Sequence, residues 1–181
     1  AALTEEGQSC REELNAEHVG KALYGRQGMT SDAQEVRALL SALTAKVQSC
    51  REELNAQAVG NALYGLQGMT SEAPEVRALL SALTAKVQSC REELKAQAVG
   101  NGLYGLQGMT SEAPEVRALL SALTAKVQSC REELKAQEVG NALYGLQGMT
   151  CEAPEVRALL SALTVKVQNC REELSPQEIG I

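Results

Sequence analysis

The sequence is poor in the groups that catalysis, metal binding and membrane insertion require. Among its 181 residues there is one histidine, His18, and no stretch approaches the roughly 20 apolar residues that span a bilayer. The cysteines and the lone histidine do not form a zinc-binding set. With 17 Lys and Arg against 23 Asp and Glu, no overall basic field collects nucleic acid or anionic lipid. We therefore expect no membrane partner, no metal and no secretory signal.

Motifs for catalysis are missing as well. The run Gly65-Leu66-Gln67-Gly68 lacks the lysine and the preceding strand of a phosphate-binding loop. Arg51, Glu52 and Glu53 recur in each unit. A solvent-exposed helix face with local ion pairs explains them more simply than a pair of catalytic carboxylates does. His18 is interpreted as a solvated surface side chain. We expect a protein that is not an enzyme and that uses no cofactor.

What the sequence does contain is a repeat of 40 residues. Residues 41–80, 81–120 and 121–160 are nearly identical, residues 1–40 are a divergent copy, and residues 161–181 stop about halfway through a unit. One unit is too small to bury a useful core, so neighbouring units must stack. The chain 1–181 is therefore predicted to be a single domain of about 4.5 repeats. The predicted fold class is all-α, a right-handed α-solenoid (superhelix) of tandem helix-turn-helix repeats.

The first helix of each unit is predicted from an apolar stripe. One such stripe begins at Val76 and continues at intervals of three or four residues into the next block of forty. It predicts a helix from about Pro74 to Leu94. A proline suits the first helical turn because its missing N–H donor has no intrahelical partner there. Thr70, Ser71 and Glu72 are expected to cap this helix.

The second helix is predicted to run from Gln57 to Gln67 and to end at Gly68. Its N-cap position is predicted to be Asn in two units and Lys in two others: Asn15, Asn55, Lys95 and Lys135. Asn can cap a helix and Lys is a poor cap. Gly60 and Gly65 lie within the predicted helix at a cost of ~1 kcal/mol each relative to Ala. We interpret them as points where a neighbouring helix approaches closely; the alternative is an opening for a ligand backbone.

Five of the six cysteines lie one unit apart: Cys10, Cys50, Cys90, Cys130 and Cys170. Equivalent atoms in stacked helices lie about 8–10 Å apart, whereas a disulfide needs Cα atoms within ~7 Å. These thiols are therefore expected to be free and buried in the stripe of the first helix. Cys151 is expected to be an exposed thiol. Buried free thiols favour an intracellular, reducing compartment, either cytoplasm or the lumen of a reducing organelle.

The two ends of the array differ from its middle. Arg26 replaces the leucine of the inner units, and Glu17, His18 and Lys21 are polar substitutions nearby, as expected of a terminal unit with a polar outer face. The C-terminal residues 161–181 begin a second helix that does not finish. Either the chain is cut from a longer array, or this unfinished repeat mediates end-to-end self-association.

Side chains off the buried stripe define a candidate ligand surface. Asn61 and Tyr64 lie one turn apart on the second helix and recur in the next two units, forming ladders along the array. Arg77 forms a similar row on the first helix. The candidate residues are Asn61, Tyr64, Arg77, Asn101, Tyr104, Arg117, Asn141 and Tyr144. Alternatively, the Tyr rings pack between units and the Asn side chains bond to a neighbouring loop.

A family resemblance rests on two segments. Residues 58–66, with the sequence AVGNALYGL, and the proline-started, leucine-rich segment 74–80 resemble the octotricopeptide-type repeats, at a similar period and over nearly the whole chain. Residues 177–180 look like the start of a further copy. The resemblance implies an α-solenoid, and in many members of the family one nucleotide of RNA is bound per repeat. Related helical-repeat proteins act as protein-binding scaffolds.

Three functions remain open from the sequence. The first is a non-enzymatic scaffold that offers an extended surface to a protein partner. The alternative is single-stranded RNA binding through the Asn and Tyr ladders and the Arg row, one nucleotide per repeat. The third is a structural or designed scaffold without a ligand, although scattered differences such as Gly102 and Cys151 favour recent natural duplication. A locally basic concave surface would favour RNA, and an acidic or apolar one would favour protein.

Overall fold

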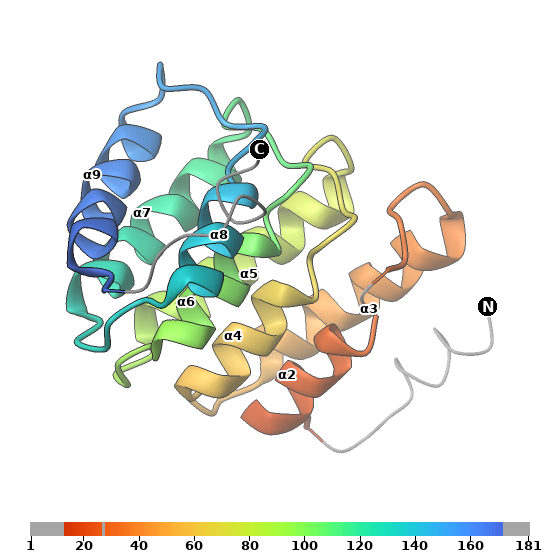
Figure 1. The fold of residues 1–181 in the computed structure, drawn as a ribbon. Helices are drawn as coiled ribbons and strands as arrows, with labels where there is room; N and C mark the ends of the chain where they lie inside the picture. Colours follow the sequence, from red (N-terminus) through yellow and green to blue (C-terminus); the bar gives the residue numbers. More distant parts are fainter. Residues whose placement is uncertain (1–12, 27, 172–181) are drawn as a thin grey trace.

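A computed structural model of the chain describes residues 13–26 and 28–171. Within these residues the fold is all-helical and its eight helices form two layers (Figure 1). The short helices are α2 (Ala16–Tyr24), α4 (Ala56–Tyr64), α6 (Ala96–Tyr104) and α8 (Ala136–Tyr144). The long helices are α3 (Gln34–Ser49), α5 (Pro74–Ser89), α7 (Pro114–Ser129) and α9 (Pro154–Asn169). The predicted α-solenoid of tandem helix pairs is confirmed.

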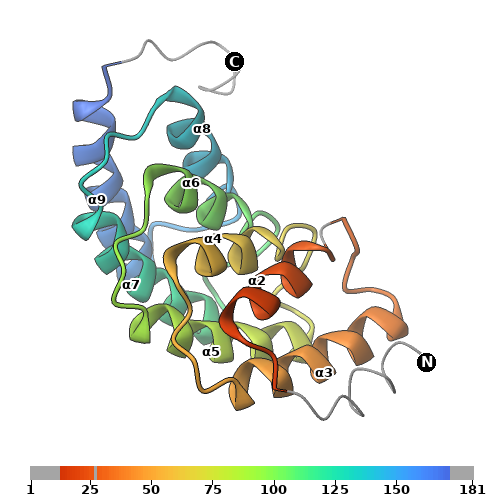
Figure 2. The same ribbon diagram turned by 90° about the horizontal axis from the view of Figure 1, so that it is seen from below.

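The array is curved, with the short helices on its inner side. Figure 2 shows α3, α5, α7 and α9 along the outer arc and the short helices inside it. Each helix packs mainly on the equivalent helix of the next unit rather than on its partner within the same unit. The long helices contribute large apolar side chains to the core, such as Leu79, Leu80 and Leu83, which are all buried.

Small residues separate the short helices. A Cβ atom placed on Gly60 would lie 3.0 Å from Cβ of Ala98 in the next unit, and one on Gly100 would lie 2.9 Å from Cα of Glu138. Distances this short would force the neighbouring helix to shift, so the interpretation of Gly60 as a point of close approach is confirmed. Glycine and alanine between the short helices, against leucine and valine between the long ones, account for the direction of the curvature.

Both helices of the unit are shorter than predicted. The long helix ends at Ser89 rather than near Leu94, because Cys90 has an extended backbone with φ −63° and ψ 115°. The short helix ends at Tyr64, and Gly65 is its C-cap rather than an interior residue. After it the chain makes tight turns, and Gly68 adopts a left-handed φ of 78°.

The N-caps of the short helices follow the sequence. Asn15 and Asn55 each accept a hydrogen bond of 2.8 Å from a backbone N–H of the first turn, as predicted. Lys95 and Lys135 make no such bond. At the start of α8 the carboxylate of Glu138 instead accepts a bond of 3.0 Å from the backbone N–H of Lys135.

The capping prediction for the long helices is wrong. Ala73 is the N-cap of α5, and no side chain bonds to the first turn there. Ser71 is buried, and its Oγ accepts a hydrogen bond of 3.1 Å from the backbone N–H of Thr110 in the next unit. The hydroxyl predicted to cap a helix therefore joins two units.

Arg26 is not part of a polar outer face, which corrects the expectation for the first unit. Its side chain is buried, with 2% of its surface exposed, in the position that Leu66 occupies in the next unit. Nη1 donates to the carbonyl of Met29 at 3.2 Å, whereas Nε and Nη2 have no partner among the described residues. Burial lowers the pKa of Arg26 to about 10. Glu17, His18 and Lys21 are exposed, as expected.

The cysteines of the described residues form no disulfide, as predicted. Cys50, Cys90 and Cys130 are buried, Cys170 is partly buried, and Cys151 is exposed, as expected. They lie at the C-caps of the long helices rather than within them. Burial raises the pKa of the Cys90 and Cys130 thiols. Cys10 and the unfinished repeat beyond residue 171 lie outside the described residues.

Two further findings concern residues 13–26 and 28–171. None of their helices has the length and apolar character needed to cross a bilayer. They contain no group of three or more His, Cys, Asp or Glu placed to hold a metal ion.

Candidate functional site

Many polar side chains of the array join one unit to the next. The carboxylate of Glu92 accepts a hydrogen bond of 2.9 Å from the backbone N–H of Ala56, the first residue of α4 in the preceding unit. The same bond joins Glu52 to Ala16 and Glu132 to Ala96. The helices α2, α4 and α6 therefore each receive a negative charge at the N-terminus from the next unit, which stabilises the exposed N–H groups there.

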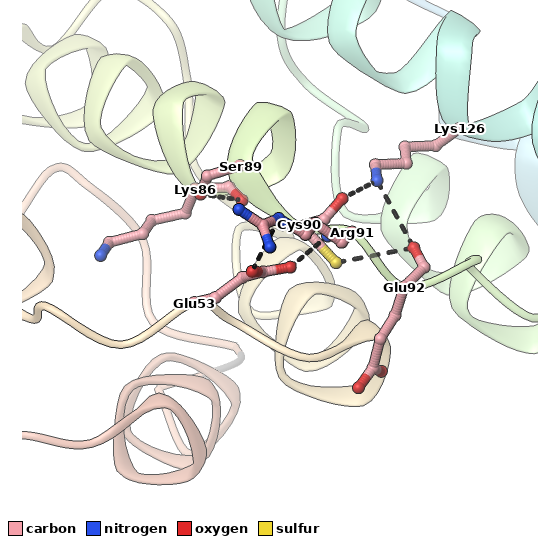
Figure 3. A network of polar contacts seen from close by, with 7 residues as sticks. All are labelled: Glu53, Lys86, Ser89, Cys90, Arg91, Glu92 and Lys126. Carbon is pink, nitrogen blue, oxygen red and sulfur yellow. Dashed lines mark hydrogen bonds and ion pairs between the residues drawn. The ribbon is translucent and has the colours of Figure 1, made fainter.

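A second set of bonds lies where each long helix ends (Figure 3). Nζ of Lys126 donates to the carbonyl of Cys90 in the preceding unit and, at 3.4 Å, to that of Glu92. The backbone N–H of Arg91 donates to Glu53, and Nε of Arg91 lies 3.7 Å from the same carboxylate. The Arg and Glu residues thus lie in an extended segment and pair between units. The expected helix face with local ion pairs is wrong.

The tyrosines of the short helices form a continuous stack. Their ring centroids are 5.5 Å apart for Tyr24 and Tyr64, 5.7 Å for Tyr64 and Tyr104, and 5.5 Å for Tyr104 and Tyr144. Successive planes are inclined by 19–21°, so equivalent groups turn by about 20° from unit to unit. Both faces of the two inner rings are covered by their neighbours. The predicted Tyr ladder is present, and its rings pack between units.

The Asn side chains, unlike the Tyr rings, do not join one unit to the next. Asn61 is half-buried on the solvent side of α4, between Gln57 and Tyr64. Within the described part of the chain, the side chains of Asn61, Asn101 and Asn141 make no hydrogen bond. The alternative that Asn bonds to a neighbouring loop is therefore not met.

A parallel row of glutamines lies one turn closer to the start of each short helix. The spacing of four residues between Gln and Asn places both amides on one side of the helix. The row consists of Gln57, Gln97 and Gln137, all exposed and likewise without a hydrogen-bond partner in the ranges 13–26 and 28–171. The same helical periodicity that marked Asn and Tyr in the sequence contains the signal for Gln57, Gln97 and Gln137, which the list of candidate residues omitted.

The amide rows line an open groove of about 680 Å³ across the short helices. Gln57, Asn61, Gln97 and Asn101 contribute to it, and Tyr24 lies at its border. Glu92, Lys95 and Glu132 lie near the N-terminal ends of the helices, so charges of both signs border the groove. In the first unit Glu17 and Lys21 occupy the Gln and Asn positions and form an ion pair of 2.5 Å, which ends the uncharged surface at α2.

The arginines of the predicted site lie apart from the amides. Arg77 and Arg117 belong to the long helices α5 and α7. Nη1 of Arg117 donates to the carbonyls of Ser111 at 2.9 Å and Glu112 at 2.8 Å, which holds the loop that precedes its own helix. Arg117 lines a separate depression with Thr150 and Glu152. The structure thus brings together the Asn and Tyr residues of the predicted site and leaves the Arg row elsewhere.

No family model matches this chain, and neither a curated protein nor a solved structure matches it.

Proposed function

We propose that the protein is a non-enzymatic helical-repeat scaffold whose short-helix layer binds an extended segment of a protein partner. The observation that carries this proposal is the contrast among polar side chains. Glu, Lys and Ser side chains of the array bond from unit to unit, whereas the Gln and Asn rows of the inner layer bond to nothing within the described residues. An interior Asn is a poor helix former, so its recurrence has a cost that packing does not recover.

Charge favours a polypeptide partner over RNA. Residues 81–120 contain four basic side chains, Lys86, Arg91, Lys95 and Arg117, and four acidic ones, Glu92, Glu93, Glu112 and Glu115. This unit is therefore neutral, residues 41–80 and 121–160 each carry a formal charge of −1, and the amide rows carry no charge. Binding to single-stranded nucleic acid depends on an excess of Lys and Arg along the phosphate backbone. A neutral amide surface instead matches the neutral peptide groups of a polypeptide.

The Tyr stack gives a second reason. Proteins that bind single-stranded RNA stack bases on open aromatic faces. The faces of Tyr64 and Tyr104 are already occupied by neighbouring rings. The resemblance of residues 58–66 to octotricopeptide-type repeats favours RNA and makes it the competing candidate, which the experiment below includes.

The test is a selection from a library of random twelve-residue peptides on the purified full chain, beside titrations with fluorescent homopolymeric RNA. We expect enriched peptides with micromolar affinity and no RNA binding at moderate salt. Replacing the inner row Gln57/Gln97/Gln137→Ala should weaken peptide binding by at least about tenfold, since each lost hydrogen bond is worth about 0.5–1.5 kcal/mol.

The matched control is the outer row Gln48/Gln88/Gln128→Ala, which removes the same exposed amides from the long helices. Binding to this variant should stay within twofold of the parent. An absence of enriched peptides, or equal losses in both variants, would overturn the proposal. Micromolar RNA binding that weakens in Tyr64/Tyr104/Tyr144→Ala would put RNA in first place.

A further inference from the structure

We infer that the short-helix layer recognises the main chain of an extended peptide, at two peptide residues per unit; this inference rests on the proposed function. The first step concerns the identity of the units. Residues 41–80 and 81–120 differ only at positions 55/95 and 62/102, so the Gln, Asn and Tyr rows present the same groups at each step. A surface of identical units can recognise only those chemical groups of the ligand that repeat along its length. In a polypeptide of mixed sequence, the repeating part is the main chain.

The second step concerns the chemistry of the amide. A peptide unit offers one N–H donor and one C=O acceptor, and the Asn side chain offers the complementary carbonyl oxygen and NH₂ group. In an extended strand, every second residue directs both its N–H and its C=O to the same side. One Asn, such as Asn61, can therefore bond to both groups of one residue and leave the next residue turned away. Asn101 then meets the residue two positions along.

The third step concerns spacing. Equivalent ring centroids on the inner layer repeat every 5.5–5.7 Å, because Gly60 and its equivalents let the short helices approach closely. Two residues of an extended strand advance about 6.6–6.8 Å, whereas one advances about 3.3 Å and three about 10 Å. Of these steps, two residues is the one nearest to the repeat. The Gln and Asn side chains have enough rotatable bonds to take up the remaining difference.

The extent of the uncharged surface gives the length of the bound segment. The Asn row runs over α4, α6 and α8, and it ends at α2, where Lys21 takes the Asn position and pairs with Glu17 at 2.5 Å. Three units at two residues each correspond to a core of about six residues. The Gln and Asn rows carry no net charge, and they end at the charged pair of α2. They therefore favour the neutral main chain of a peptide over a pattern of charged side chains.

The experiment is a backbone scan of the twelve-residue peptide that the selection enriches most, measured by fluorescence anisotropy with the full chain. Each peptide residue is N-methylated in turn, and in a second series each amide is replaced by an ester, which removes the donor without adding a methyl group. We expect losses of at least tenfold at every second residue over a core of about six, and less than twofold at the residues between. The intervening positions serve as the matched control for the chemical change itself.

On the protein side, Asn61/Asn101/Asn141→Ala should abolish the two-residue pattern, whereas Gln48/Gln88/Gln128→Ala should leave it intact. Losses that are uniform, that recur every third residue, or that arise only from side-chain replacements would overturn the inference and leave peptide binding standing. A selection that enriches no peptide would instead overturn the proposed function itself, so the two failures are distinguishable.

Discussion

The two helix layers of this array use different side chains for the same task. The long helices pack through leucine and valine and supply more of the buried Leu and Val side chains than the short helices do, among them Leu79 and Leu80. The short helices also bury Val59 and Leu63, but where they approach most closely they meet through glycine and alanine, and a Cβ on Gly60 would lie 3.0 Å from the next helix. The comparison teaches that one layer buries apolar area, while the other gives up side-chain volume to bring identical surface groups close together.

The sharpest way to break the spacing of the short layer is Gly105→Ala. The new Cβ would lie 1.9 Å from the carbonyl oxygen of Leu63, a backbone atom that cannot move away cheaply. Overpacking typically costs about 1–3 kcal/mol and occasionally more, and an overlap this close with a backbone atom should lie at the upper end of that range. Chemical denaturation should show this loss. The matched variant is Gly25→Ala, whose nearest atom is the oxygen of Lys21 at 3.3 Å, and it should lose far less. Equal losses in the two variants would refute a spacing set by Gly105.

The long layer is tested by truncating its core. Leu80 is fully buried between units, so Leu80→Ala should cost about 2–5 kcal/mol through lost burial and a cavity. Leu160 is the equivalent residue in the last described long helix and is only partly buried. Leu160→Ala should therefore cost roughly half as much. Thermal melting followed by circular dichroism compares the two, and a larger effect at Leu160 would contradict the stacking described here.

Arg26→Leu tests how the buried arginine of the first unit affects stability compared with the leucine of the inner units. Replacing a buried, incompletely paired charge by the leucine of the inner units should raise the free energy of unfolding by about 1–4 kcal/mol. Burial lowers the pKa of Arg26 to about 10, below its unfolded value. Both states are therefore protonated below pH 9, and the gain should be constant between pH 6 and 9. Above pH 10 the parent recovers stability and the gain shrinks. Denaturation curves across this range would contradict the assignment if Leu lowered stability.

The smallest expected effect is a gain in the short layer from Gly102→Ala. Ala62 and Ala142 hold the equivalent positions, and a Cβ on Gly102 would meet only the side chain of Leu63, with Cδ1 at 3.1 Å and Cβ at 3.6 Å. The higher helix propensity of alanine should add up to about 1 kcal/mol to the free energy of unfolding. A lowered melting temperature would show that Leu63 cannot yield.

Periodicity in the sequence predicted the two-helix unit and the Asn caps, which depend on spacing within one unit, and the stacking and unpaired thiols, which follow from repeating that unit. It failed where a residue bonds to another unit. Leu94 continues the helical spacing of the stripe, but the backbone from Cys90 onwards is extended and its groups bond to neighbouring units. Likewise, the prediction that Ser71 caps a helix is wrong because its hydroxyl bonds to Thr110 of the next unit.

For the candidate site, too, the sequence predicted the arrangement within one helix but not the arrangement between the two layers. Asn61 and Tyr64 share a helix, so their alignment followed from sequence alone. The separation of Arg117 from them depends on how the two layers are arranged, and its bonds to Ser111 and Glu112 have no signature in the spacing. The burial of Arg26 likewise contradicts its chemistry and follows only from its place in the core.

The junctions between units also bear on how such a gene evolves. Each described junction reuses the same atoms, as in the bonds from Ala16 to Glu52, from Ala56 to Glu92 and from Ala96 to Glu132. Unequal recombination that adds or removes one copy therefore leaves each remaining junction fully bonded. The length of the inner surface, and with it the reach of the protein along a partner, can change by copy number without a single compensating substitution.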